Sequence, residues 1–287
     1  MNKSYGGQAI LEGVMMAGKE YYVASTRLDN GKIISKNFKM KSNFLSKIPL
    51  IRGMNNLIVM MIKGIKTLNW SADQQIQNEN DEKPQNSVLN SILLFITTIF
   101  SLFLAILIFK FLPLSLVKLT NIKNPFLFNL IDASIKFTLF VCYILILSLW
   151  KDTRRIFEYH GAEHKVIGCY EKNEKLTPKN CKKYRKEHKR CGTNFIFFVI
   201  TVSVFVYLFV PINLNIFLNT AIRVILLPLI AGISYEILKI AGKYDNWFTN
   251  LIASPGMFLQ KLTTSEPNDK QIEVAINSLK ELIKIDN

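Results

Sequence analysis

The sequence predicts a mainly α-helical, polytopic membrane protein with about four transmembrane helices and a mixed α+β cytoplasmic part. Apolar stretches of roughly the length that a bilayer core requires are the first observation. They are residues 88–109, 126–150, 195–210 and 214–234. Strand-like segments precede them, and basic residues gather beside them, as on the cytoplasmic side of membrane proteins. Because a lipid bilayer explains the net charge of +15, we do not expect a nucleic-acid partner.

Residues 1–70 are expected to form a cytoplasmic β-hairpin and an amphipathic helix. Residues 6–16 place three glycines and Glu12 around a short apolar core. This pattern predicts a buried turn–strand–turn, or else a position for Glu12 near the histidines of the chain. Residues 21–28 and 32–38 are strand-like, and Asp29-Asn30-Gly31 between them is typical of a hairpin turn.

Residues 49–70 carry apolar side chains at helical spacing, with basic residues among them. The charges interrupt the stretch too often for a membrane span. We therefore expect a helix that lies at the membrane surface or packs on the cytoplasmic part. Residues 71–87 are polar, which predicts a mobile linker.

Two transmembrane hairpins are predicted at residues 88–150 and 195–236. The first contains Asp132 and Lys136, which are one helical turn apart and can pair. The second contains Arg223, which is costly in lipid unless it is paired. We expect Arg223 to pair with Asp132 or to line a polar cavity. A structural ion pair and an ion or substrate path are both compatible with this prediction.

The basic residues predict the orientation of the spans. The segment 151–194 is dense in lysine and arginine, whereas residues 111–125 hold only Lys118 and Lys123. The positive-inside rule then places the chain in the cell membrane with both termini in the cytoplasm. The C-terminal region, residues 237–287, is expected to hold a turn-rich link over 255–267 and an amphipathic helix from Asp269 to Ile285, capped by Asn268.

The candidate site is centred on His160 and His164, which a helix brings onto one face. With Glu163 they form the pattern His-x-x-Glu-His, which is typical of inverted zinc hydrolases. Gly161 between them costs about 1 kcal/mol in a helix relative to alanine, which indicates close approach of another backbone or a later helix start. A divalent metal, with zinc the first candidate, is the expected cofactor.

Two ligand arrangements are compatible with the sequence. Thr177-Pro178 predicts a basic helix to about Lys189, which ends at a further histidine and cysteine. A closed site of four protein ligands would hold a structural zinc. An open site of two histidines and one further ligand would leave room for chemistry, with Glu163 or Glu12 as base. The further candidate ligands in these arrangements are His188, Cys191 and Glu236. A third interpretation makes the histidines ordinary polar residues near lipid headgroups.

The chain resembles the YqhQ-like family of bacterial membrane proteins of unknown function. The resemblance rests on motifs along nearly the whole chain, at residues 6–16, 51–53, 160–165, 190–193, 235–236, 255–260 and 262–264. The resemblance implies a membrane location and a metal-dependent enzyme. The description as a metal-dependent enzyme derives from the same histidine motif. Lys189 stands where the family has proline and Ala17 where it has a basic residue. Neither departure removes a candidate ligand.

Three functions are compatible with these patterns. The first is a membrane-associated metal-dependent enzyme, for which the His-x-x-Glu-His pattern predicts the hydrolase type. The second is a non-catalytic membrane assembly protein with a structural metal. The third is a small transporter built around Asp132 and Arg223, which would require a homo-oligomer. The sequence specifies no substrate.

Overall fold

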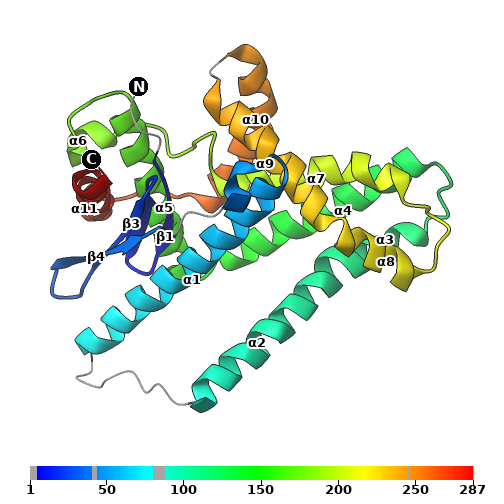
Figure 1. Cartoon of the computed structure of the whole chain (residues 1–287), viewed down its shortest axis with the longest axis horizontal. Helices are drawn as coiled ribbons and strands as arrows, with labels where there is room; N and C mark the ends of the chain where they lie inside the picture. Colours follow the sequence, from blue (N-terminus) through cyan, green and yellow to red (C-terminus); the bar gives the residue numbers. More distant parts are fainter. Residues whose placement is uncertain (1–4, 41–43, 80–87, 245, 287) are drawn as a thin grey trace.

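The computed structural model describes residues 5–40, 44–79, 88–244 and 246–286 (Figure 1). The chain is mainly helical and contains a small antiparallel sheet of four strands in the order β1-β2-β3-β4. The strands are β1 (Gly6–Ile10), β2 (Gly13–Ala17), β3 (Tyr21–Arg27) and β4 (Ile33–Lys39). The predicted hairpin over residues 21–38 is thus confirmed as β3–β4.

The glycine-rich N-terminal segment forms two strands rather than the expected turn–strand–turn. Leu11 and Glu12 make a two-residue connection between β1 and β2, and Glu12 has a φ of 49°. This left-handed backbone lets the chain reverse within two residues. The apolar core of the segment is therefore divided between two paired strands.

Each face of the sheet is covered by helices. One face packs on α5 (Lys151–Glu171) and α11 (Asp269–Asp286), with Val14, Val166 and Leu279 in the shared core. The opposite face packs on α1 (Ile51–Glu79), where Met60 and Trp70 contact the sheet core. The predicted capping of α11 is confirmed, because Asn268 and Gln271 exchange hydrogen bonds of 2.9 and 3.0 Å.

Helix α1 extends nine residues beyond the predicted helix, so the linker prediction is wrong for residues 71–79. Polar side chains in this part of α1 bind the sheet. Ser71 Oγ accepts the backbone N–H of Leu11, and Gln75 Nε2 donates to Thr26 and Arg27. These tertiary hydrogen bonds stabilise a helix that composition alone does not predict. The remainder of the predicted linker, residues 80–87, lies outside the described residues.

The apolar helices extend away from the sheet (Figure 1). Among the described residues, three continuous segments are long and apolar enough to cross a membrane, Phe95–Lys118, Pro125–Leu147 and Gly192–Phe209. A fourth exists if α8 (Ile216–Ile225) and α9 (Leu227–Lys243), which are bent by 43°, form one broken span. The first segment comprises part of α2 (Val88–Ile106), the π-helix η2 (Leu107–Phe111) and α3 (Leu112–Lys118). The second segment is α4 (Pro125–Leu147). The third comprises α7 (Gly192–Val206) and η3 (Tyr207–Phe209).

The predicted pairing of Asp132 with Arg223 is confirmed. Arg223 Nη1 lies 2.7 Å from Asp132 Oδ2, and Lys136 pairs with the same oxygen. The rest of the guanidinium donates to Asn129 and Asn219, each at 2.7 Å. Arg223 and Asp132 are both buried. Since the guanidinium is satisfied on all sides by helix side chains, this network supports the interpretation as a structural ion pair.

The predicted basic helix over residues 178–189 is wrong, because α6 covers only Pro178–Cys181. Lys165, a buried residue of α5, takes main-chain carbonyls that such a helix would need. Its Nζ donates to the carbonyls of Lys182 and Tyr184, and His164 Nδ1 bonds to that of Lys186. The segment after Cys181 is thereby held against α5 as turns and irregular backbone.

The predicted turn-rich link over residues 255–267 is wrong in its first half. Helix α10 (Trp247–Thr263) runs through Pro255. A proline leaves the carbonyl four residues earlier without its backbone donor. Ser254 Oγ compensates by donating to the carbonyl of Leu251 at 3.0 Å. Only the residues between α10 and α11 form a link.

Candidate metal centre

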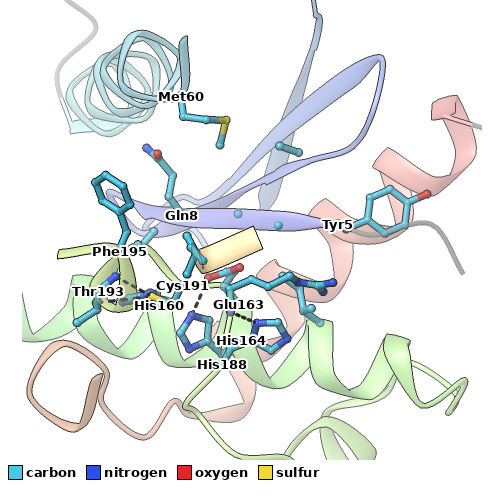
Figure 2. Close-up of a pocket in the computed structure, with 18 of the residues that line it drawn as sticks. Tyr5, Gln8, Met60, His160, Glu163, His164, His188, Cys191, Thr193 and Phe195 are labelled. Carbon is cyan, nitrogen blue, oxygen red and sulfur yellow. Dashed lines mark hydrogen bonds and ion pairs between the residues drawn. The ribbon is translucent and has the colours of Figure 1, made fainter. Parts of the chain in front are cut away.

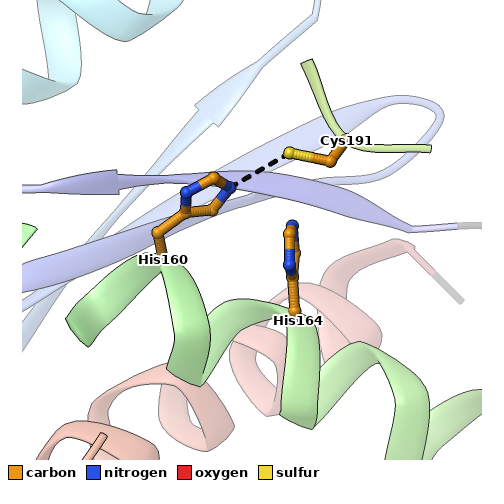
Figure 3. Close-up of side chains that lie close together, drawn as sticks. All are labelled: His160, His164 and Cys191. Carbon is orange, nitrogen blue, oxygen red and sulfur yellow. Dashed lines mark hydrogen bonds between the residues drawn. The ribbon is translucent and has the colours of Figure 1, made fainter. Parts of the chain in front are cut away.

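Helix α5 and the start of α7 bring three metal-ligating side chains together. His160 and His164 lie one turn apart on α5, with ring centroids separated by 4.4 Å. Cys191 is the N-cap residue of α7, and its Sγ lies 3.2 Å from His160 Nε2. Ligand atoms of all three lie within 4.8 Å of one another (Figure 3). Histidine nitrogen and cysteine sulfur are the ligand types that zinc prefers in proteins, so this group is a candidate metal site.

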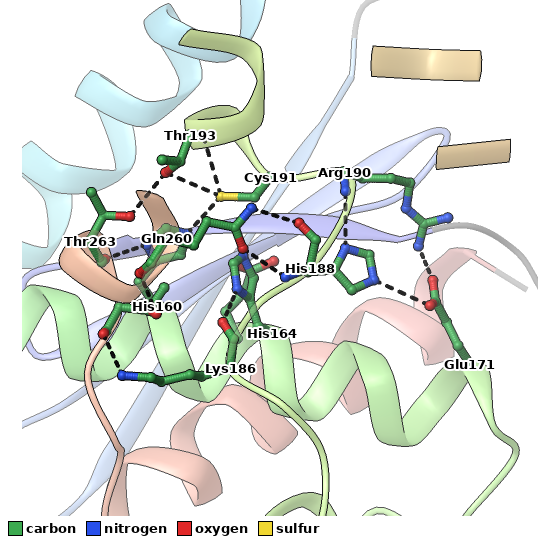
Figure 4. A network of polar contacts seen from close by, with 12 residues as sticks. His160, His164, Glu171, Lys186, His188, Arg190, Cys191, Thr193, Gln260 and Thr263 are labelled. Atoms are coloured by element: carbon green, nitrogen blue, oxygen red, sulfur yellow. Dashed lines mark hydrogen bonds and ion pairs between the residues drawn. The ribbon is translucent and has the colours of Figure 1, made fainter. Parts of the chain in front are cut away.

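Both imidazoles are oriented by main-chain carbonyls. His160 Nδ1 lies 2.9 Å from the carbonyl of Thr263, and His164 Nδ1 bonds to the carbonyl of Lys186 (Figure 4). Because a carbonyl only accepts, each Nδ1 carries the proton and each Nε2 keeps its lone pair. Zinc-binding histidines typically have such a partner on the nitrogen that does not bind metal.

Burial sets the charge of His164 and Cys191. It lowers the pKa of His164 well below the usual value for histidine, so this imidazole is neutral at neutral pH. It also raises the pKa of Cys191 to about 12, so the thiol keeps its proton in the absence of a neighbouring cation. Neutral imidazole is the form that binds metal, and a bound cation favours the thiolate. Two imidazoles and a thiol make a donor set that fits zinc.

Glu163 projects beside the three ligands. Its carboxylate accepts a hydrogen bond from the backbone N–H of Gly7 on β1, while Oε2 has no hydrogen-bond partner among the described residues. Oε2 lies 3.5 Å from His164 Nε2. The side chain is buried, and this burial raises the pKa of its carboxyl group. A buried carboxylate oxygen without a donor next to an imidazole lone pair indicates room for a cation or a proton.

A cavity of about 850 Å³ adjoins the three ligands (Figure 2). Its walls come from β1, α1, α5, the start of α7, and α9. His160, His164, Cys191 and Glu163 all line it. This volume is within the usual range for small-molecule and cofactor sites.

The other predicted site residues have different partners. His188 lines the same cavity, but its Nε2 lies 3.3 Å from Glu171 Oε2 and it is not part of the three-ligand group. Glu12 forms an ion pair with Arg155 and accepts from the hydroxyl of Tyr159. Thus the structure brings together His160, His164, Cys191 and Glu163, and gives His188 and Glu12 separate contacts.

Glu236 on α9 is bound by Arg52 on α1. Arg52 Nε lies 2.7 Å from Glu236 Oε1, and the backbone N–H of Leu50 points to the same oxygen at 3.4 Å. These donors lower the pKa of Glu236, Arg52 most of all. The pair joins α1 to α9, and Glu236 is not part of the group formed by His160, His164 and Cys191.

Sequence reasoning missed the residues that position the site. Gln260 on α10 brackets His188, accepting from its N–H at 2.7 Å and donating to its carbonyl at 2.8 Å. Thr193 donates its N–H to Cys191 Sγ at 3.4 Å and its hydroxyl contacts that of Thr263. The sequence motifs at 190–193 and 255–264 contain these residues. Their spacing carries no signal for the hydrogen bonds, because the partners lie on α10, at the start of α7 and in the segment between α6 and α7.

Comparisons with known proteins agree on one family. Residues 48–285 match the model described as "Protein of unknown function (DUF1385)". The chain is 37% identical to the uncharacterized protein YqhQ of Bacillus subtilis (strain 168), over 99% of this chain and 93% of that relative. No solved structure matches. The chain therefore belongs to the DUF1385 family, of which YqhQ is a member and whose function is unknown.

Proposed function

We propose that this protein is a membrane-bound, metal-dependent enzyme of the hydrolase type, with its site at the cytoplasmic surface. The observation that supports the metal most strongly is the pair of backbone carbonyls on His160 and His164. They leave both Nε2 lone pairs on the side of Cys191 Sγ, within 4.8 Å of one another. An ordinary pair of polar histidines has no need of this arrangement.

Three protein ligands leave one position of a tetrahedral zinc open, as in catalytic sites. A bound cation would act as a Lewis acid and polarise a substrate oxygen or a water molecule. Glu163 would accept a proton at Oε2, the oxygen without a hydrogen-bond partner among the described residues. Gly7 holds the carboxylate by its N–H and so orients Oε2. A closed structural site would require His188, whose contact with Glu171 favours the open arrangement.

The membrane location in this proposal follows from the helices. Four spans, with α8 and α9 forming the broken one, and both termini in the cytoplasm agree with the basic segment 151–194. Cys191 precedes α7 directly, which puts the candidate metal at the end of a span. Exposed apolar side chains on α1 and α10, among them Met61, Ile62, Trp247 and Phe258, suit helices that rest on lipid. The division into N-terminal, transmembrane, basic and C-terminal regions stays a prediction.

Metal analysis of detergent-purified protein tests the proposal. We expect about one zinc per chain in the wild type and a near-complete loss in the double variant His160→Ala/His164→Ala. Glu163→Gln and His188→Ala should both keep the metal, since neither removes one of the three ligands. Loss of zinc in His188→Ala would favour the structural four-ligand site. A metal-free wild type after zinc loading would refute the metal centre.

A further inference from the structure

We infer that the cavity binds an extended peptide segment, which adds to the outer edge of β1 and so presents its backbone to the metal centre. This inference rests on the proposed function and names the substrate class of the same site. β1 is the first strand of the sheet, and among the described residues no strand pairs with its outer edge. Gly6, Gly7, Gln8 and Ala9 of β1 all line the cavity. An unpaired strand edge is a template for another chain.

The register of β1 shows which backbone groups are directed at the cavity. The two-residue connection closes at Ile10 and Gly13, a pair that faces each other directly. Hydrogen bonding alternates along an antiparallel pair, so Ile10, Gln8 and Gly6 bond to β2. Gly7 and Ala9 therefore direct their N–H and carbonyl groups outward. The hydrogen bond from the Gly7 N–H to Glu163 agrees with this assignment.

The edge lies directly against the proposed proton acceptor. A Cβ added to Gly7 would be 3.0 Å from Glu163 Cγ and 2.5 Å from the carbonyl oxygen of Met15, so only glycine fits between the sheet and α5. A strand paired with β1 would lie about 4.8 Å away from it, which carries its peptide bonds past Glu163 and His160. Glycines at positions 6 and 7 also leave this stretch of backbone uncovered by side chains.

The other helices that line the cavity contribute apolar side chains. Leu57 and Met60 on α1 and Phe195 and Ile196 on α7 are apolar, and Lys63 on α1 adds a positive charge. Met60 and Phe195 are labelled in Figure 2. An edge that offers backbone donors and acceptors, in a cavity also lined by apolar side chains, matches a peptide whose alternate side chains point both ways. An acyl chain would leave the outward carbonyl of Gly7 and the outward N–H and carbonyl of Ala9 unmatched, so a lipid fits this cavity less well.

In the reaction that follows from this placement, an amide of the bound segment is hydrolysed. The oxygen of water bonds to the carbonyl carbon and the C–N bond breaks. Glu163 takes a proton from the water and passes it to the leaving nitrogen, so atoms and charge balance. Oε2, which has no hydrogen-bond partner among the described residues, is the atom that carries this proton.

Amide hydrogen exchange of the full chain in detergent micelles tests the inference, with reduced and carboxymethylated casein as the unfolded polypeptide probe. Zinc-loaded Glu163→Gln is used so that the probe is not cut. We expect exchange of the Ala9 amide, whose N–H does not bond to β2, to slow at least tenfold with casein present. Unchanged exchange there, or protection by a dispersed phospholipid but not by casein, would overturn the peptide assignment.

A substitution at the edge provides the matched control. Ala9→Pro removes an N–H that the β1–β2 ladder does not use, whereas Ala9→Ser keeps it. By fluorescence anisotropy, labelled casein should bind Ala9→Pro at least tenfold more weakly, and Ala9→Ser within twofold of the parent. Equal zinc content in both variants verifies the fold, and equal binding would refute strand addition. Should the wild type hold no zinc, the proposed function fails while the exchange result still decides whether β1 accepts a strand.

Discussion

Gly161, the residue after the first histidine, joins the site to the C-terminal part of the chain. A Cβ at this position would lie 2.2 Å from the carbonyl oxygen of Ser265, whose N–H bonds to the carbonyl of Phe157 at 2.9 Å. The close backbone approach that the sequence indicates is therefore the correct interpretation of this glycine. It keeps the segment after Thr263 against the helix that carries both histidines.

We predict that Gly161→Ala destabilises the protein. The overpacking costs about 1–3 kcal/mol and outweighs the gain of about 1 kcal/mol from the better helix former. Thermal unfolding in detergent measures this loss. Gly192→Ala is the control, because a Cβ there meets nothing within 4 Å. An unchanged or higher melting temperature for Gly161→Ala would mean that the Ser265 segment moves freely.

The sulfur ligand allows a spectroscopic prediction. Cobalt(II) bound by His160, His164 and Cys191 should show a thiolate-to-metal charge-transfer absorption. Cys191→Ser should lose this band, since a serine hydroxyl is far harder to deprotonate. Cys142→Ser is the control, because this exposed cysteine on α4 is not part of the ligand group. A band that persists in Cys191→Ser would assign the sulfur ligand to another cysteine.

The sequence predicts the candidate ligands better than it predicts the groups that orient them. His160 and His164 are detectable because helical spacing alone puts them on one face. Cys191 is detectable as a candidate because it stands in the same polar segment. The carbonyls of Thr263 and Lys186 that orient the imidazoles are not detectable, since any residue type has a carbonyl. The sequence alone therefore leaves both the open and the closed arrangement of candidate ligands possible.

At the scale of secondary-structure elements, a local sequence signal predicts the element correctly where the tertiary contacts of that segment do not compete with it. The Asn268–Gln271 capping box predicts the start of α11 because both partners lie within one turn. Thr177-Pro178 does start a helix, but Lys165 Nζ takes the carbonyls of Lys182 and Tyr184, which the helix would need to continue after Cys181. Pro255 predicts a helix break that does not occur. Ser254 Oγ donates to the carbonyl of Leu251 and so replaces the backbone donor that the proline lacks.

The ion pair between α4 and α8 should be a major stabilising contact of the helical part. Asp132→Ala would leave Arg223 and Lys136 buried without a carboxylate, which costs about 3–5 kcal/mol. We expect a clearly lower unfolding temperature in detergent. Ser134→Ala, on the exposed side of the same helix, should change it little. A stable Asp132→Ala variant would indicate that water or another anion reaches the two cations.

For the whole molecule, the topology decides whether a cytoplasmic site is possible. The proposed four spans put the short connection at residues 119–124 outside and helix α11 inside. In intact cells, a membrane-impermeant maleimide should therefore label Asn121→Cys but not Lys280→Cys, which is exposed on α11. The second variant should react only after the membrane is permeabilised. The parent chain with its four native cysteines gives the background.

The reverse labelling pattern would put the histidines outside the cell. The basic segment 151–194 would then stand on the side that the positive-inside rule disfavours, and only that rule supports the cytoplasmic assignment. The metal centre itself would survive such a result, since its ligands, carbonyl partners and cavity depend on local packing. The source of its substrate would change, because an edge strand outside the cell meets exported polypeptides and one inside meets cytoplasmic or membrane-inserting segments. The two labelling sites thus separate the location of the proposed reaction from its chemistry.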